Sequence, residues 1–339
     1  MSSLAFSRSP RWLTLWLFLM IALVMAMIVV GGATRLTNSG LSITEWAPIR
    51  GALPPLSDAQ WLSEFEKYKQ IPEFEAEHPD MDMAGFRFIY FWEWAHRQLG
   101  RVIGLVYAVP FLILVFRRRL PKGRVAAYTA VLLLIGLQGA IGWWMVYSGL
   151  QEGMVSVSQY RLATHLGMAF IILGTLVWLF LDARRRGEMR RGGSRLVPVL
   201  LGVTFLQIVA GAFVAGTDSG KTYNTWPLMD GEVVPEGYLI QEPAFRNIFE
   251  NPAAIQFNHR TLAYILLVLF VVVAWRYRRS PRLRWPLLIV GGLLLWQTLL
   301  GIWTLLSVAP LSLALKHQAS AVYLFVATVW LTYHSRQIR

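Results

Sequence analysis

Four of the six histidines fall in strongly apolar parts of the chain: His96, His165, His259 and His317. Imidazole is a common metal ligand, and a polar side chain in lipid is costly and usually serves a function. Each of the four precedes the arginine that ends its apolar segment (Arg117, Arg184, Arg276 or Arg336) by 17 to 21 residues. Because a helix rises about 1.5 Å per residue, all four imidazoles should lie at a similar depth. We expect His78 and His334 to be solvated surface residues.

Two neutral imidazoles from facing helices of a four-helix bundle can hold a haem iron from both sides. Gly100 and Gly104 follow His96 on its own helix face and leave room for a flat ring. A zinc or di-iron site is the competing interpretation, because Glu93 and His96 form a Glu-x-x-His pair. A di-iron site needs a second such pair and further carboxylates, which the other apolar segments lack. Thiolate sites are excluded because the chain has no cysteine.

Long helices must position these histidines, and the composition favours them. Hydrophobic residues make up 55% of the 339 residues and charged residues 15%, as is typical of a polytopic membrane protein. The uncharged runs that reach the ~20 residues of a membrane-spanning helix are 12–34, 125–151, 162–181, 196–217 and 285–315. We predict an all-α integral membrane protein whose first run is retained rather than cleaved as a signal peptide.

The net charge of +13 does not indicate a nucleic-acid partner, because it comes from short basic segments between the apolar runs. RRRLPKGR (117–124), ARRRGEMRRGGSR (183–195) and RYRRSPRLR (276–284) fit the positive-inside rule and are predicted to be cytoplasmic. The long segments 36–85 and 216–252 hold 15 of the 19 acidic residues and are predicted to be outside. This pattern predicts eight transmembrane helices with both termini in the cytoplasm.

The chain also contains an internal duplication. TNSG (37–40) recurs 180 positions later as TDSG (217–220), and the Trp, Gly and Pro that follow keep the same offset. HRQL (96–99) is matched by HRTL (259–262). We predict two tandem four-helix bundles related by a pseudo-two-fold axis along the membrane normal. Their bounds are an N-terminal half (1–182), a cytoplasmic basic linker (183–195) and a C-terminal half (196–339).

Glu93 distinguishes the two halves, because Gln256 takes its place in the second. Residues three apart share a helix face, so Glu93 should project into the same cavity as His96. One interpretation is an ion pair with Arg97 or Arg35. The other is a proton acceptor or charge stabiliser beside a reacting haem. The asymmetry favours chemistry in the N-terminal half and a permanent, electron-transferring haem in the C-terminal half.

Arginines lie near the histidines in both halves. Arg97 and Arg260 each directly follow a histidine, and Arg35 lies close to the outer end of the first apolar run. These three are candidate partners for haem propionates or other charges. The alternative for Arg97 and Arg260 is snorkelling to the membrane interface.

The chain closely resembles the haem A synthase family from about residue 25 to residue 325. The segments that carry the resemblance are GGATRLTNSGLSITEW (31–46), EFEKYKQIPEF (64–74), FWEWAHRQLGR (91–101), YNTWPLMDG (223–231), QFNHR (256–260) and LALKHQASA (313–321). The resemblance implies an oxidoreductase of the bacterial cytoplasmic (inner) membrane. It would oxidise the C8 methyl of haem O to a formyl group, giving haem A for cytochrome c oxidase.

The resemblance also implies roles for individual residues. His96 and His165 would hold the substrate haem. His259 and His317 would be the iron ligands of a haem b cofactor, and Glu93 the catalytic acidic residue. The absence of cysteine places the chain with the cysteine-free subgroup of the family. The implied partners are haem O and the lipid bilayer, with haem O synthase, a membrane or quinone electron acceptor and a second copy of the chain as candidates.

The residues alone leave two other functions open. The first is a di-haem, cytochrome b-like carrier that exchanges electrons with quinone, and the second is a transporter whose histidines relay protons. A carrier needs no acid in one half only, so Glu93 opposite Gln256 favours the enzyme. A transporter should have polar residues near the midplane, whereas here they are at the outer edge. The segment 47–85 either covers the substrate cavity or forms a helix at the membrane interface.

Overall fold

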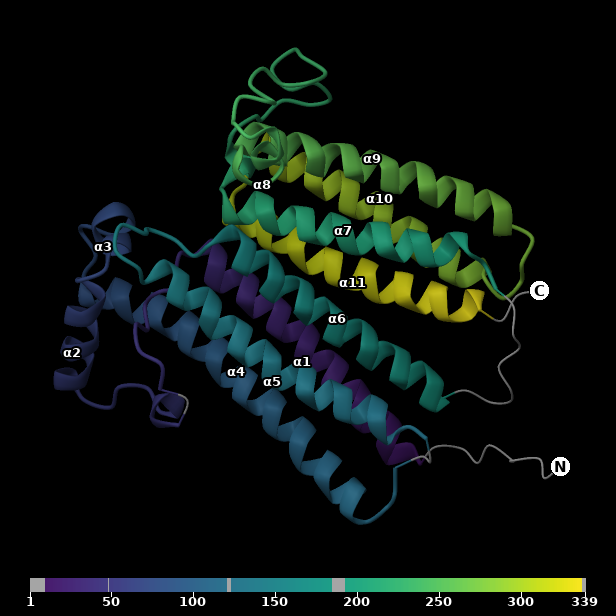
Figure 1. Ribbon diagram of the computed structural model, residues 1–339, viewed down its shortest axis with the longest axis horizontal. Helices are drawn as coiled ribbons and strands as arrows, with labels where there is room; N and C mark the ends of the chain where they lie inside the picture. Colours follow the sequence, from purple (N-terminus) through teal and green to yellow (C-terminus); the bar gives the residue numbers. More distant parts are fainter. Residues whose placement is uncertain (1–9, 48, 121–122, 185–192, 337–339) are drawn as a thin grey trace.

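The chain folds into long helices that run side by side, with short helices at one end (Figure 1). This computed structural model describes residues 10–47, 49–120, 123–184 and 193–336. The long helices are α1 (Arg11–Leu36), α4 (Met83–Phe116), α5 (Val125–Gly149), α6 (Gln159–Arg184), α7 (Leu196–Gly216), α9 (Pro252–Tyr277), α10 (Arg284–Leu306) and α11 (Leu311–Ser335). No strand occurs in these ranges apart from an isolated bridge between Met229 and Glu232. The predicted all-α class is confirmed, and residues 185–192 of the predicted basic linker lie outside the described ranges.

Seven of the described helices are long and apolar enough to cross a membrane, so the chain is a multi-pass membrane protein. They are α1, α4, α5, α6, α7, α9 and α10. The sequence predicts an eighth span where α11 lies, and α11 is not among the seven. The reason is its composition: Lys316, His317 and Gln318 lie near its N-terminal end. Twelve of its 25 residues are buried, which is how a less apolar helix is accommodated within a bundle.

Each group of four helices forms a closed ring of contacts. α1 packs on α4, α4 on α5, α5 on α6, and α6 returns to α1. In the second group α7 packs on α9, α9 on α10, α10 on α11, and α11 returns to α7. The two rings contact each other through α1 and α6 of the first ring and α7 and α11 of the second (Figure 1). α4 and α6, and likewise α9 and α11, are therefore diagonally opposite in their rings.

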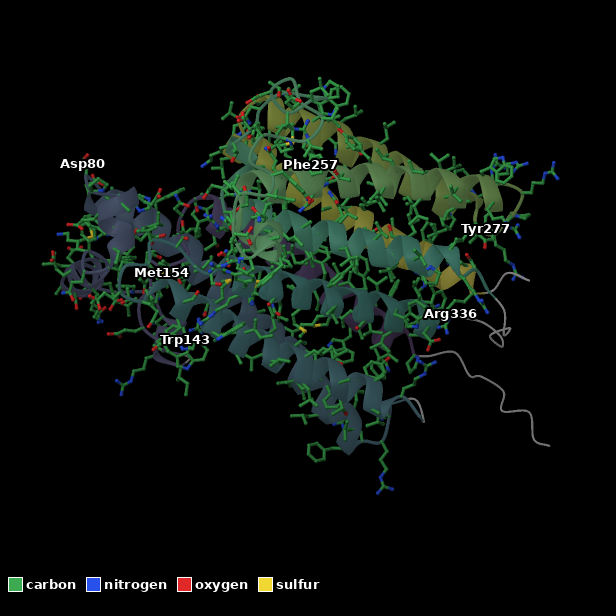
Figure 2. The ribbon with its side chains drawn as sticks, turned by 45° about the horizontal axis from the view of Figure 1, so that its top comes forward. Asp80, Trp143, Met154, Phe257, Tyr277 and Arg336 are labelled. Carbon is green, nitrogen blue, oxygen red and sulfur yellow. The ribbon has the colours of Figure 1, made fainter. Side chains whose placement is uncertain are left out.

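The short helices gather at one end of the molecule. They are η1 (Arg50–Ala52), α2 (Asp58–Tyr68), α3 (Pro72–Glu77), η2 (Ser219–Lys221), η3 (Ala244–Arg246) and α8 (Asn247–Glu250). Figure 2 shows Asp80 and Met154 at this end, and Tyr277 and Arg336 at the opposite end. The acidic and the basic segments of the chain are thus separated along the helix axes.

α4 is longer than a membrane span and carries the short helices of the first half. It begins at Met83 after Asp82, whose carboxylate accepts a hydrogen bond from the Gly85 amide. This start places Phe91, Glu93 and His96 within the helix. Its first turns bury Phe86 against Phe65 of α2, so α2 is fixed to the outer end of α4.

A glycine at the contact between the two rings suggests a test of how they are joined. A Cβ added to Gly32 of α1 would overlap Oε1 of Gln318 on α11. The Gln318 Nε2 donates a hydrogen bond of 2.9 Å to the Ile28 carbonyl. Gly32→Ala should displace this amide and lower the free energy of unfolding by about 1 kcal/mol, the net value of one hydrogen bond. Thermal unfolding in detergent measures the change.

The control is the same substitution in a Gln318→Ala background. There the hydrogen bond is already absent, so adding the methyl group should cost little, and the two substitutions should be strongly non-additive. Equal losses in both backgrounds would contradict a role for the Gln318 amide.

Candidate functional site

Each of the four histidines in the bundles lies against a glycine of an adjacent helix. The pairs are His96 with Gly31, His165 with Gly142, His259 with Gly211 and His317 with Gly301. A Cβ added to these glycines would lie 2.8–3.3 Å from the nearest ring atom, which is closer than ordinary van der Waals contact. The absence of a side chain is what lets each imidazole approach the neighbouring backbone.

His96 of α4 and His165 of α6 face each other across the first ring of helices. Their ring centroids are 6.3 Å apart and their planes are inclined by 65°. A metal–imidazole bond is about 2.0–2.1 Å, and the ring centre lies about 1 Å behind the ligating nitrogen. Two imidazoles on opposite sides of one metal ion therefore have centroids about 6 Å apart, as these two have.

His259 of α9 and His317 of α11 occupy the corresponding diagonal of the second ring. Over the described ranges, no group of three or more His, Asp or Glu side chains is arranged to hold a metal ion. Zinc sites need three or four protein ligands, whereas a haem iron needs two axial ones. The paired imidazoles, and the glycines against which they pack, therefore fit haem.

Three glutamines, none of them predicted as a site residue from the sequence, each brace one of the histidines. Gln138, Gln207 and Gln297 each donate from Nε2 to the backbone carbonyl of a histidine, at 3.0, 3.1 and 3.0 Å. The same nitrogens lie 3.2–3.4 Å from both ring nitrogens of that histidine. A sequence signal that would have identified these glutamines is the pattern Gln-x-x-x-Gly. In each case the glycine of the pattern packs against the same histidine that the glutamine contacts.

Glu93 is 3% exposed and accepts four hydrogen bonds. Its Oε2 accepts from the Ser42 hydroxyl at 2.8 Å and the Ile43 amide at 2.7 Å. Its Oε1 accepts from Nε and Nη2 of Arg97 at 3.1 and 2.6 Å. A carboxylate has about four acceptor sites, so all of them are occupied. The ion pair considered from the sequence is formed with Arg97, while Arg35 pairs with Asp218 at 3.1 Å.

Arg97 and Arg260 occupy equivalent places and hold the outer loop of their own half. Arg97 donates to the carbonyls of Ile43 and Glu45. Arg260 donates from Nη2 to three loop carbonyls, those of Thr225, Pro227 and Leu228. The Nη1 of Arg260 is buried without a hydrogen-bond partner. An anionic group such as a propionate would satisfy that nitrogen.

Gln256 forms different hydrogen bonds from those of Glu93. Its Nε2 donates to the Tyr223 carbonyl at 3.0 Å, and its Oε1 is buried without a partner. An amide thus holds the outer loop of the second half directly. In the first half a carboxylate holds the equivalent loop through Ser42 and Ile43 and is neutralised by Arg97.

A second buried carboxyl, missed by sequence analysis, lies near Glu93. Glu73 of α3 is 5% exposed, and the Tyr68 hydroxyl lies 3.3 Å from its Oε2 and 2.7 Å from Nδ1 of His78. Burial, with the nearby negative charge of Glu93, raises the pKa of Glu73 to about 8. The expectation that His78 is a solvated surface residue is wrong, because it is half-buried, hydrogen-bonded to Tyr68, and its pKa is lowered by burial.

His334 also differs from the expectation. It lies at the C-terminal end of α11, half-buried, with its ring 5.6 Å from the ring of Trp330. The periodicity of α11 turns this side chain partly into the bundle, so it is not a fully solvated residue.

The raised pKa of Glu73 predicts a pH-dependent stability of the outer segment. The folded state binds a proton that the unfolded chain releases near its ordinary pKa of 4.5. This stabilisation is therefore complete below pH 4.5 and is lost as the pH rises through about 8. The groups facing Glu73 are Tyr68, Glu77, Arg35 and Glu93. Glu73→Gln should remove the decline, as measured by the unfolding temperature against pH.

Glu75→Gln is the matched control, since Glu75 is an exposed carboxylate on the same short helix. It should leave the wild-type decline of stability with pH in place. A decline that persists in the Glu73 variant would contradict the assignment.

Comparison with known proteins identifies a family and relatives that match this chain over most of its length. A family model described as cytochrome oxidase assembly protein (COX15-CtaA) matches residues 14–329. The chain is 50% identical to a protein named heme A synthase from Maricaulis maris, covering 98% of each chain. It is 48% identical to the heme A synthase of Paracoccus denitrificans, covering 95% of this chain and 87% of that one. With the heme A synthase of Caulobacter vibrioides it shares 46% identity over 97% and 98% of the two chains.

Proposed function

Since this chain belongs to the COX15-CtaA family of cytochrome oxidase assembly proteins, we propose how its four paired histidines divide the work of a haem A synthase. The chain is a membrane enzyme that oxidises the C8 methyl of haem O to the formyl group of haem A, for use in cytochrome c oxidase. Its substrate is therefore a haem, and two sites for flat iron-bearing rings follow from two pairs of imidazoles.

His96 and His165 are the ligands we propose for the substrate haem O, and His259 and His317 those for a haem b cofactor. The observation that carries this division is the buried carboxylate. Glu93 lies one helical turn from His96, whereas the second half has the neutral Gln256 at the matching position. A charge that is costly to bury is retained in only one of two otherwise similar sites.

The residues of the first half suit an oxidation at a carbon atom. When bound, a haem iron supplies the one-electron chemistry. Removing electrons from the methyl carbon leaves positive charge there, which a fixed carboxylate stabilises without reorganising. Arg97 and the Ser42 and Ile43 donors hold the Glu93 carboxylate in one orientation, and these contacts also fix the outer loop beside the site.

We propose that the chain crosses the membrane eight times, with α11 as the eighth span. Support comes from the two closed rings of contacts, which follow the same helix order in residues 1–182 and 196–339. The pseudo-two-fold axis along the membrane normal follows from this order and from the constant offset of 180. By the positive-inside rule the basic segments and both termini are cytoplasmic, and the membrane is the bacterial cytoplasmic membrane.

Haem O synthase and a quinone or other membrane electron acceptor are the partners proposed for substrate supply and electron removal, and self-association stays a prediction. A di-haem, cytochrome b-like carrier is the second function considered. It would keep both haems unchanged and would have no use for Glu93.

The test is pigment extraction from cells that make haem O, with and without this chain. Haem A should appear only when the chain is present, and chromatography separates it from haem O and haem b. Haem O as the sole farnesylated pigment in both cultures would overturn the proposal, while bound haem b without haem A would favour the carrier.

A further inference from the structure

One of the four histidines lacks the glutamine that braces the other three. Gln138, Gln207 and Gln297 each stand four residues before the glycine that seats the braced histidine. Before Gly31, the seat of His96, the residue at this place is Met27. Positions 27 and 207 are related by the same offset of 180 that relates the outer loops, so methionine replaces glutamine at an equivalent position.

The space around Met27 is adapted to this replacement. Its Cε would lie 3.2 Å from a Cβ added to Gly100, which is one turn beyond His96 on α4. The residue one turn beyond His259 on α9 is Ala263. The two halves therefore use different pairs, Met27 with Gly100 and Gln207 with Ala263.

Replacing glutamine by methionine changes how the neighbouring histidine is held. A glutamine amide donates to the histidine carbonyl and lies beside the ring, so it fixes the helix backbone and the imidazole together. A thioether cannot donate a hydrogen bond, and methionine is the most adaptable apolar side chain. Packing against Gly31 without such an amide thus leaves His96 with more freedom than the three braced histidines.

We propose that His96 is the releasable ligand of the enzyme and that Met27 is the positioning residue that makes it so. This inference rests on the proposed function, in which the N-terminal pair holds a haem that must enter as substrate and leave as product. His165 then retains its place in every turnover while His96 disengages. In the other half, Gln207 and Gln297 hold both ligands of the cofactor, which stays bound.

The test is a reciprocal exchange of the two pairs. Met27→Gln with Gly100→Ala transfers the pair of the second half to the first, and Gln207→Met with Ala263→Gly does the reverse. Purified protein loaded with haem O is mixed with excess apomyoglobin, and the haem O and haem b left on the enzyme are quantified by chromatography over time. This readout does not depend on turnover.

Release of haem O should become roughly tenfold slower in the first double variant, the effect expected of one added hydrogen bond. Release of haem b should become faster by a similar factor in the reciprocal variant. Met27→Leu, which adds no donor, should release haem O at the wild-type rate and separates bracing from altered packing. Release rates that stay at wild-type values in both double variants would overturn the proposal.

Failure of the proposed function gives a different result. If wild-type protein binds no haem O, or if His96→Ala binds as much of it as wild type, the assignment of the N-terminal site is wrong. If haem O binds in a manner that depends on His96 and His165, and the exchange variants change nothing, only the ligand-release proposal fails.

Discussion

His259→Ala and His317→Ala should each yield purified protein that has lost the absorption spectrum of the proposed haem b cofactor. Both rings are seated on glycines, at 3.2 Å and 2.8 Å from the added Cβ, and both are braced by glutamine. A haem held by two axial imidazoles loses one of its two protein–iron bonds in either variant. The measurement is the haem-to-protein ratio after purification in detergent.

His334→Ala is the control for His317→Ala, because both residues lie on α11 and only His317 lies against the glycine and glutamine of α10. The control should retain the full haem b content. Full haem b in both His259→Ala and His317→Ala would refute the cofactor assignment, since the two residues would then not be its ligands.

Glu93→Gln should abolish the conversion of haem O to haem A while leaving the cofactor haem bound. An amide nitrogen cannot accept hydrogen bonds, so in either orientation the side chain faces Arg97 or the Ser42 and Ile43 donors with an N–H group. Arg97 also loses its counter-charge. Breaking a buried ion pair lowers the free energy of unfolding by about 3–5 kcal/mol. The lower end of this range applies here because the Arg97 side chain is 20% exposed.

Two further variants distinguish chemistry from structural damage. Glu93→Asp keeps the negative charge and should retain part of the activity if charge is what the reaction needs. Gln256→Glu places a carboxylate in the second half and should leave the N-terminal site intact. Haem A produced at the wild-type level by Glu93→Gln would show that the carboxylate has no catalytic role.

Much of the fold was accessible from the sequence because membrane-spanning helices have a strong local signal. Uncharged runs of about 20 residues can satisfy their backbone groups in lipid only as helices, and each of the five predicted runs corresponds to one of the seven helices that are long and apolar enough to cross a membrane. α11 shows the limit of this signal. Its polar residues lower its hydropathy, and whether such a helix enters a bundle depends on burial by its neighbours.

The histidines likewise combine a property that the sequence predicts with one that depends on packing. Their similar distances from the arginines that end the apolar segments predicted a similar depth, because rise per residue is fixed by the helix. Which rings face one another depends on the order of helices around each ring, and only the packing brings His96 to 6.3 Å from His165. The buried Glu73 beside Tyr68 and His78 had no sequence signal, because the surrounding segment reads as an ordinary charged surface.

The sequence by itself determined the all-helical membrane class, the internal repeat, the four histidines and the asymmetry between Glu93 and Gln256. These are properties of residue type and spacing, which a regular helix preserves. Only the tertiary structure decided that Arg97, rather than Arg35, neutralises Glu93, and that glutamines brace three histidines but not His96. Such contacts join residues from different helices, and side-chain packing between helices selects them.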